Sequence, residues 1–130
     1  MHRLAIDVQP GEYAVARLAA DAPAPVGLID QKPNVLISVT RTPGELSIIC
    51  PAGLVPEGST SETGWRLLTV RGPLEFTLTG IIAALSSELA AAGVALFSLS
   101  TFDTDHVLVK ADDLTRAVAA LRESGHEVGE

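Results

Sequence analysis

The sequence predicts an α+β fold, and the order of elements in residues 65–130 carries that prediction. A strand pattern comes first, a helix pattern that ends in glycine follows, and two more strand patterns lead into a second helix pattern. A strand, a helix, two strands and a helix in this order make up most of a ferredoxin-like βαββαβ module. We therefore expect residues 65–130 to form one such module.

The first strand and the first helix are separated by a sequence that fits neither. Leucine and valine give residues 65–71 the content of a half-buried strand, and Gly72-Pro73 ends it because proline cannot donate to a sheet. Thr77 or Thr79 can then cap a helix. The apolar residues of this helix recur at helical spacing: Ile81, Ile82, Leu85, Leu89 and Ala92.

Two strands and a second helix are expected to complete this half. Gly93 stops the first helix, and strands follow over residues 94–100 and 106–110. Asp112 or Asp113 can cap a second helix, whose apolar residues again recur at helical spacing. Gly125 ends that helix, and residues 126–129 can add a last short strand.

The N-terminal half shows strand patterns without full helices. Alternation predicts a strand over residues 13–19 and an edge strand over residues 4–8. A hairpin of residues 35–40 and 46–50 is expected, because Pro43-Gly44 suits a turn: proline presets φ, and glycine can take a positive φ.

Residues 51–64 separate the two halves. Proline and glycine recur throughout this stretch, so it is expected to be irregular. We place the domain boundary at its end, which gives an N-terminal module of residues 1–64 and a C-terminal module of residues 65–130.

Composition and charge exclude several classes of protein. A net charge of −7 without a run of Lys or Arg argues against nucleic acid or a membrane surface as a partner. No stretch approaches the ~18 apolar residues of a membrane span, and no signal-peptide layout is present. Cys50 is the single cysteine and is expected to be a buried hydrophobe. A cytoplasmic protein is expected.

No pattern of catalytic residues is present, so the sequence predicts neither an enzyme nor a cofactor. It lacks a nucleophile elbow, a phosphate-binding loop, a dinucleotide fingerprint and a zinc-protease helix. In a rival interpretation, Asp103, Asp105 and His106 bind a metal ion and the protein is an enzyme. Side chains two apart on a strand lie well separated along it, so no metal is predicted.

Two segments could hold a small molecule. The helix that begins near Gly80 offers unpaired N–H groups and a positive dipole end, which suit a carboxylate. The alternative is ordinary capping with tight helix–sheet packing at Gly80. Residues 100–105 (STFDTD) combine three hydroxyls with two carboxylates, which can pair with an ammonium or guanidinium group. The alternative there is a simple turn at Asp103 and Thr104, with Asp105 facing solvent.

These same segments resemble the ACT-domain family. The resemblance rests on residues 78–85 (LTGIIAAL), 89–94 (LAAAGV) and 100–105, and Gly80 and Gly93 match two glycines of the ACT pattern. More narrowly, residues 100–105 resemble small bacterial tandem-ACT proteins whose relatives include the cytosolic arginine sensor of the TOR pathway. The resemblance covers nearly the whole chain, and it implies tandem ACT-like modules with the N-terminal one reduced.

The resemblance implies a function as well. ACT modules typically hold an amino acid at the loop before the first helix, at an interface between modules, and their sheets commonly join side by side. We therefore expect a regulatory amino-acid sensor without catalysis that forms a homodimer; the alternative is a protein–protein interaction module with a vestigial pocket. The expected ligand-binding residues are Ser38, Thr40, Thr79, Gly80, Ile81, Thr101, Phe102, Asp103, Thr104 and Asp105.

Ser38 and Thr40 are included because the family places their strand against the partner module. Residues two apart share one face of a strand, so both side chains could reach a ligand held there. The alternative is a solvent-exposed strand end with Arg41 beside a turn.

Overall fold

The computed structural model describes residues 3–30, 33–74 and 80–130. The chain forms two compact units: unit 1 is Met1–Pro10 with Arg66–Glu130, and unit 2 is Gly11–Trp65. The division falls within one residue of the boundary expected after Gly64. The first residues of the chain, however, were expected in the N-terminal module and instead belong to unit 1.

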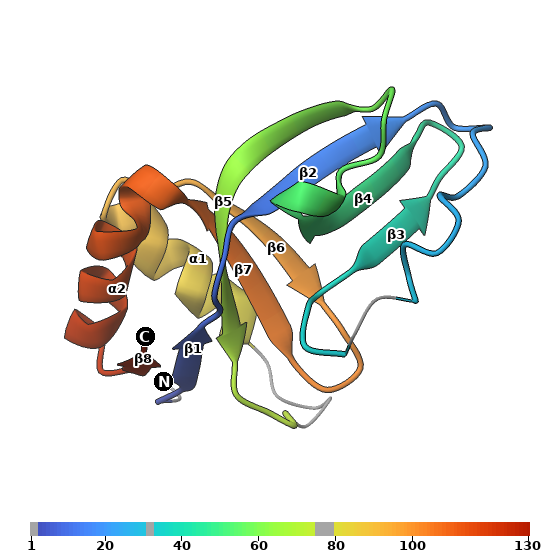
Figure 1. Cartoon of the computed structure of the whole chain (residues 1–130). Helices are drawn as coiled ribbons and strands as arrows, with labels where there is room; N and C mark the ends of the chain where they lie inside the picture. The colour runs from blue at the N-terminus through green and yellow to red at the C-terminus, as the bar shows by residue number, and fades with distance from the viewer. Residues whose placement is uncertain (1–2, 31–32, 75–79) are drawn as a thin grey trace. The chain divides into compact units, whose positions relative to one another are not determined.

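Unit 1 contains the helices of the chain that the structure describes, together with five strand segments (Figure 1). The order from β5 onward is strand, helix, two strands, helix and strand, which confirms the predicted ferredoxin-like α+β fold. Its elements are β1 (Ala5–Val8), residues 66–70 of β5 (Thr60–Val70), α1 (Ile81–Ala91), β6 (Leu96–Ser100), β7 (Asp105–Lys110), a 3₁₀ turn (Ala111–Asp113), α2 (Leu114–Glu123) and β8 (Glu127–Gly129).

The strand β1 is an internal strand of unit 1, not the edge strand that the alternation suggested. It pairs antiparallel with β5, where Ile6 lies opposite Val70, and parallel with β8, where Ala5 lies opposite Glu127. On the other side β5 pairs with β7, and β7 pairs with β6. Alternation shows which face of a strand is buried, but it does not show which strands flank it.

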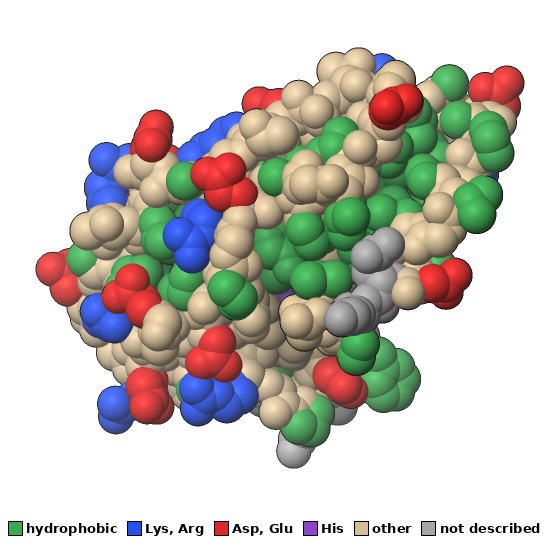
Figure 2. Space-filling model, viewed as in Figure 1, with side chains coloured by type: hydrophobic (Ala, Val, Ile, Leu, Met, Phe, Trp, Pro, Cys, Tyr) green, Lys and Arg blue, Asp and Glu red, His purple; other side chains and the backbone are tan. Residues whose placement is uncertain are grey.

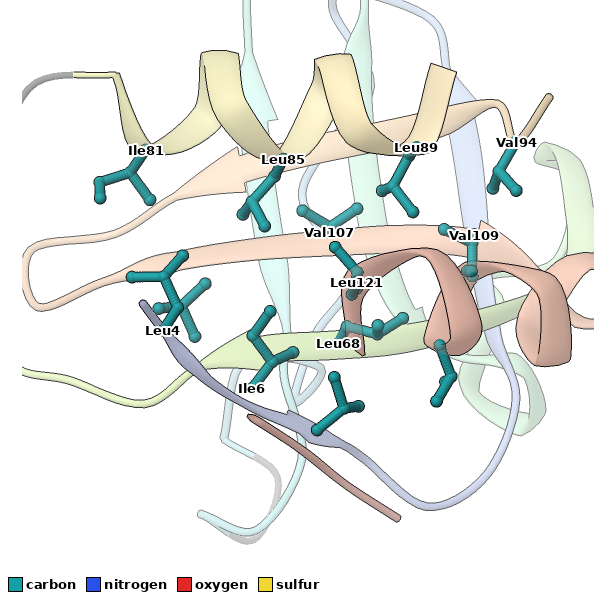
Figure 3. Packing of buried hydrophobic residues seen from close by; sticks show 14 residues of the cluster. Leu4, Ile6, Leu68, Ile81, Leu85, Leu89, Val94, Val107, Val109 and Leu121 are labelled. Carbon is teal, nitrogen blue, oxygen red and sulfur yellow. The ribbon is translucent and has the colours of Figure 1, made fainter. Parts of the chain in front are cut away.

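The core of unit 1 lies between its strands and its two helices. Ile81, Leu85 and Leu89 form one apolar stripe of α1 and point toward the strands in Figure 3. They meet Val107 and Leu68, which are buried on the helix-facing side of β7 and β5. Burying an aliphatic side chain of this size stabilises a fold by roughly 1.5–3 kcal/mol, so this stripe fixes α1 firmly against the sheet.

Both ends of α1 are set by glycine. Gly80 occupies the N-cap position with φ 80°, and the predicted caps Thr77 and Thr79 lie outside the described residues. At the other end the N–H of Gly93 donates to Ala90 and the N–H of Val94 donates to Leu89. This pattern is a Schellman motif with Gly93 in the left-handed conformation, so the predicted stop is confirmed.

Unit 2 consists of strands and one 3₁₀ turn in its described part. The strand β4 lies between β3 and β2, and β2 pairs in turn with residues 60–65 of β5. Burial raises the pKa of the Cys50 thiol, which packs as a small hydrophobe, as predicted. The elements are β2 (Tyr13–Leu18), β3 (Ser38–Arg41), β4 (Leu46–Pro51), the turn Ala52–Leu54 and the first part of β5.

The strand β5 begins at Thr60, inside the stretch that was expected to be irregular. Its first residues pair with β2, where Thr60 lies opposite Arg17 and Glu62 opposite Val15. Gly64 has φ 79° at the point where the pairing register shifts, so this glycine sits at an irregularity within the strand and does not end it. Strand pairing overrides the local glycine signal here.

The predicted hairpin of unit 2 forms, with two differences. The strand β3 begins at Ser38, three residues later than expected. In the turn, the hydroxyl of Thr42 accepts the N–H groups of Gly44 and Glu45 at 3.2 Å each. Gly44 does not use the positive φ that a glycine can take, and the Thr42 hydroxyl closes the turn.

Charged residues of unit 1 pair with one another instead of forming a single-sign patch. Figure 2 shows Lys and Arg beside Asp and Glu over the face in view. Arg71 contacts Asp7 at 2.7 Å and lowers the pKa of that carboxyl by donating to it, and Arg116 contacts Asp113 at 2.6 Å. Among the described residues, no helix is long and apolar enough to cross a membrane.

Candidate functional site

A pocket of about 470 Å³ opens at the N-terminal end of α1. Small-molecule sites commonly measure about 300–1,000 Å³, so a metabolite fits in it. The pocket lies wholly within unit 1, between the first turn of α1 and the turn that joins β6 to β7. The lining residues are Leu74, Gly80, Ile81, Ile82, Ala83, Ser100, Thr101, Phe102, Asp103, Thr104 and Asp105.

The structure brings together most of the residues that the sequence singled out. Those that line the pocket are Gly80, Ile81, Thr101, Phe102, Asp103, Thr104 and Asp105. Thr79 lies outside the described residues. Ser38 and Thr40 lie on β3 of unit 2 and line no part of this pocket. Arg41, beside them, donates to the carbonyl groups of Ala20 and Ala22 and so fastens a loop of its own unit.

The prediction missed four lining residues. Ile82 and Ala83 belong to the helix turn whose N–H groups had already been singled out, and Ser100 opens the hydroxyl-rich segment. These three could have been found by extending each segment by one or two residues. Leu74 carries no signal in the sequence, because only the folded chain brings it to the β6–β7 turn.

Three hydrogen bonds hold the β6–β7 turn in place. The hydroxyl of Thr104 donates to the carbonyl of Val70 at 2.6 Å, and the N–H of Leu74 donates to the carbonyl of Asp103 at 2.6 Å. Within the turn, the N–H of Thr101 donates to the carbonyl of Thr104 at 2.9 Å. The proton of the Thr104 hydroxyl is therefore used by the fold, which leaves its oxygen as an acceptor only.

Gly72 allows this turn to come close to the end of β5. A Cβ at this position would lie 3.0 Å from the carbonyl oxygen of Asp103 and 3.1 Å from Cβ of Thr104. We expect Gly72→Ala to push the turn away, to lower the free energy of unfolding by about 1–3 kcal/mol and to weaken binding in the pocket. Urea unfolding measures the first effect. Gly53→Ala is the control, because a Cβ there meets nothing within 4 Å; equal stability of both variants would contradict the close contact.

Two carboxylates give the pocket a negative charge. Asp105 is half-buried and accepts the hydroxyl of Ser100 at 2.6 Å, whereas Asp103 is exposed. The described lining contains neither Lys nor Arg. This arrangement favours a cationic group beside Asp105.

The first turn of α1 supplies the opposite polarity. The N–H of Ala84 donates to the carbonyl of Gly80 at 2.8 Å, so the N–H groups of residues 81–83 have no partner within the helix. Together with the helix dipole they suit a carboxylate. A Cβ at Gly80 would meet nothing within 4 Å. Glycine is therefore required here for the left-handed backbone of the N-cap and not for tight helix–sheet packing, so of the alternative only the capping part holds.

His106 lies next to the pocket, between two hydroxyl groups. Its Nδ1 is 3.0 Å from Oγ1 of Thr69, and its Nε2 is 3.4 Å from Oγ1 of Thr101. Burial lowers the pKa of His106, and the nearby Asp105 carboxylate raises it by a smaller amount. In the described part of the chain, no three His, Cys, Asp or Glu side chains are grouped so that they could hold a metal ion.

Comparison with known families matches both halves of the chain. The ACT-domain family model matches residues 60–123, which contain α1, the β6–β7 turn and α2. A second model, which describes an N-terminal domain, matches residues 11–58.

Three relatives illustrate the similarity. A crystal structure of an Agrobacterium tumefaciens protein is 34% identical, with 98% of this chain and 93% of that one covered and a TM-score of 0.88. The human cytosolic arginine sensor for mTORC1 subunit 1 is 36% identical over 73 residues, which are 55% of this chain and 22% of the sensor. The aspartate kinase of Clostridium acetobutylicum is similar in fold alone, with 12% identity and a TM-score of 0.68; the match covers 95% of this chain and 35% of the kinase.

This chain therefore matches only about a fifth of the length of the curated sensor. Residues 66–123 of the ACT match fall in unit 1, whose ferredoxin-like order of elements the structure shows independently. On these grounds residues 60–123 of the chain belong to the ACT-domain family.

Proposed function

We propose that this protein is a regulatory sensor that binds a free amino acid reversibly in the pocket at the start of α1 and catalyses no reaction. One observation carries the proposal: a single pocket presents both the carboxylate of Asp105 and the N–H groups of residues 81–83, which have no partner within α1. A free amino acid carries an ammonium and a carboxylate on one carbon atom. The two ends of this pocket complement those two charges.

Each part of the ligand has a partner in the lining. The carboxylate of the amino acid accepts N–H groups from the first turn of α1, and its ammonium group donates to Asp105. Hydrogen bonds to charged groups are worth about 1.5–3 kcal/mol each. The side chain of the ligand contacts Phe102, which is 79% exposed and can bury apolar surface when a ligand covers it.

The relatives support a regulatory role. One is named as a cytosolic arginine sensor, and the aspartate kinase of similar fold is described as an allosteric enzyme.

A homodimer is part of the proposal. The strand β6 pairs only with β7 among the described strands, so its outer edge keeps backbone groups that a second copy can pair with. Phe97 on this strand is 37% exposed. Light scattering after size-exclusion chromatography tests this state, and a monomer at high concentration would contradict it.

A thermal-shift screen against the twenty amino acids tests the proposal. A ligand that binds only the folded state stabilises it by about 2.7 kcal/mol at ~100 times its Kd, which raises the Tm of a chain of this size by roughly 10 °C. We expect one or a few amino acids to give such a rise. No rise with any of them would favour the alternative, a protein–protein interaction module with a vestigial pocket.

A further inference from the structure

We propose that His106 is a positioning residue that makes amino-acid binding depend on pH. A second proton on its ring weakens the binding of a cationic group at Asp105, and a cation bound there disfavours that proton. The inference rests on the proposed function and deepens it. It assigns a role to a side chain that lies beside the pocket without lining it.

Hydrogen-bond directions define the state of the ring at neutral pH. The hydroxyl of Thr101 donates to the carbonyl of Thr104 at 3.2 Å, so its oxygen accepts from Nε2–H of His106. The lone pair of Nδ1 then accepts the hydroxyl of Thr69 at 3.0 Å. A neutral imidazole with its proton on Nε2 gives each donor and acceptor from Thr69 through His106 to Thr101 a hydrogen-bond partner.

These hydrogen bonds connect the sheet to the pocket through His106. Thr69 lies on β5, His106 lies on β7, and Thr101 lines the pocket. By donating to Thr101, the imidazole fixes the hydroxyl that in turn holds the carbonyl of Thr104. The neutral ring and the doubly protonated ring both carry a proton on Nε2, so this hydrogen bond to Thr101 persists in both states, and the second proton acts on the turn through its charge.

A second proton on the ring changes the charge of the site. When Nδ1 becomes a donor, the hydroxyl of Thr69 can rotate and accept its hydrogen bond, because a hydroxyl can both donate and accept. The ring nitrogens of His106 contact the hydroxyls of Thr69 on β5 and Thr101 in the turn, and Leu99 on β6 lies opposite His106 in the pairing register; none of these three is charged. Asp105 on β7 is the charged neighbour, and its interaction with the ring is attractive only when the ring is protonated.

The effect on binding has a definite sign. A protonated ring offsets the charge of Asp105, so the ammonium group of a ligand is held less strongly as the pH falls. By linkage, the bound ammonium lowers the pKa of His106 by the same coupling. Because burial already lowers this pKa from its ordinary value of about 6.5, the change falls below that pH. Neither charge of a neutral amino acid titrates between pH 5 and 7.5.

Calorimetry on the full chain tests the inference with the amino acid that gives the largest thermal shift, histidine excepted. Between pH 7.5 and a pH at which NMR shows the ring of His106 to be protonated, we expect the affinity of the wild-type protein to fall at least about fivefold. In His106→Asn, which keeps an N–H donor and does not titrate, the affinity should stay constant. A wild-type affinity that does not change with pH, or a fall of equal size in His106→Asn, would overturn the inference.

A second measurement needs no ligand and so separates the two proposals. In the free protein, the amide NMR signals of Thr101 and Thr104 should shift with the same midpoint as the ring of His106, and this shift should vanish in His106→Asn. Amides that do not follow the ring would refute the role of His106 even if an amino acid binds. If the amides follow the ring and no amino acid binds, the proposed function fails and the connection through His106 stands.

Discussion

The Asp105→Asn variant should bind its amino acid roughly 10- to 100-fold more weakly than the wild-type protein. Asparagine keeps an acceptor for the hydroxyl of Ser100, which donates to Asp105 at 2.6 Å, so the local hydrogen bond survives. In the proposed site the substitution removes only the charge that would face the ligand, and a hydrogen bond to a charged group is worth about 1.5–3 kcal/mol. Calorimetry at pH 7.5 measures the affinity, and urea unfolding should show a stability within about 0.5 kcal/mol of the wild type.

Asp112→Asn is the matched control for this experiment. It makes the same chemical change at an exposed aspartate of the 3₁₀ turn before α2, outside the pocket lining. Its affinity should equal that of the wild type, which excludes a general effect of net charge. If Asp105→Asn also binds as tightly as the wild type, the ligand does not sit beside Asp105.

The His126→Ala variant should lose about 3–5 kcal/mol of the free energy of unfolding. The side chain of His126 is fully buried, and its Nδ1 accepts the N–H of Leu4 at 3.1 Å. Its Nε2 therefore carries the proton and donates to Glu88 at 2.7 Å. Alanine would leave a buried backbone N–H and a nearly buried carboxylate without these partners.

The contacts of His126 also explain why the start of the chain belongs to unit 1. Glu88 lies on α1, and Leu4 leads into β1, so one imidazole joins a helix to the first strand. The second carboxylate oxygen of Glu88 is buried and has no hydrogen-bond partner among the described residues. The Glu88 carboxylate therefore depends on the N–H of His126, and losing that donor should destabilise the fold.

Urea unfolding of three variants tests the role of this pair. Replacing both partners by leucine (His126→Leu with Glu88→Leu) should recover part of the loss, because no buried carboxylate then remains unpaired. Glu88→Gln, which still accepts from Nε2, should be milder than His126→Ala. A loss below about 1 kcal/mol in His126→Ala would show that the pair does not hold α1 and β1 together.

Features that depend on neighbours in sequence were predictable. The helix α1 follows from apolar residues at helical spacing and from Gly93, and the structure shows both the stripe and the glycine stop. The hydroxyls and carboxylates of residues 100–105 marked this segment as a candidate binding site, and in the structure it lines the pocket. In each case the physical cause lies within a few residues of the prediction.

Features that depend on contacts between distant residues were not predictable. The alternation in β1 gave no sign that β5 and β8 would flank it. The close approach of Gly72 to Asp103 and the bond from Thr69 to His106 join residues more than thirty positions apart. The placement of Ser38 and Thr40 near a ligand rested on the family pattern, and it stays a prediction.

The most direct test of the proposed site is an amide NMR titration with the amino acid that stabilises the protein most. If that amino acid binds between the first turn of α1 and the β6–β7 turn, the largest shifts should fall on residues 80–83 and 100–105, and they should disappear in Asp105→Asn. Saturable shifts that leave both segments unchanged would place the ligand elsewhere and contradict the central claim.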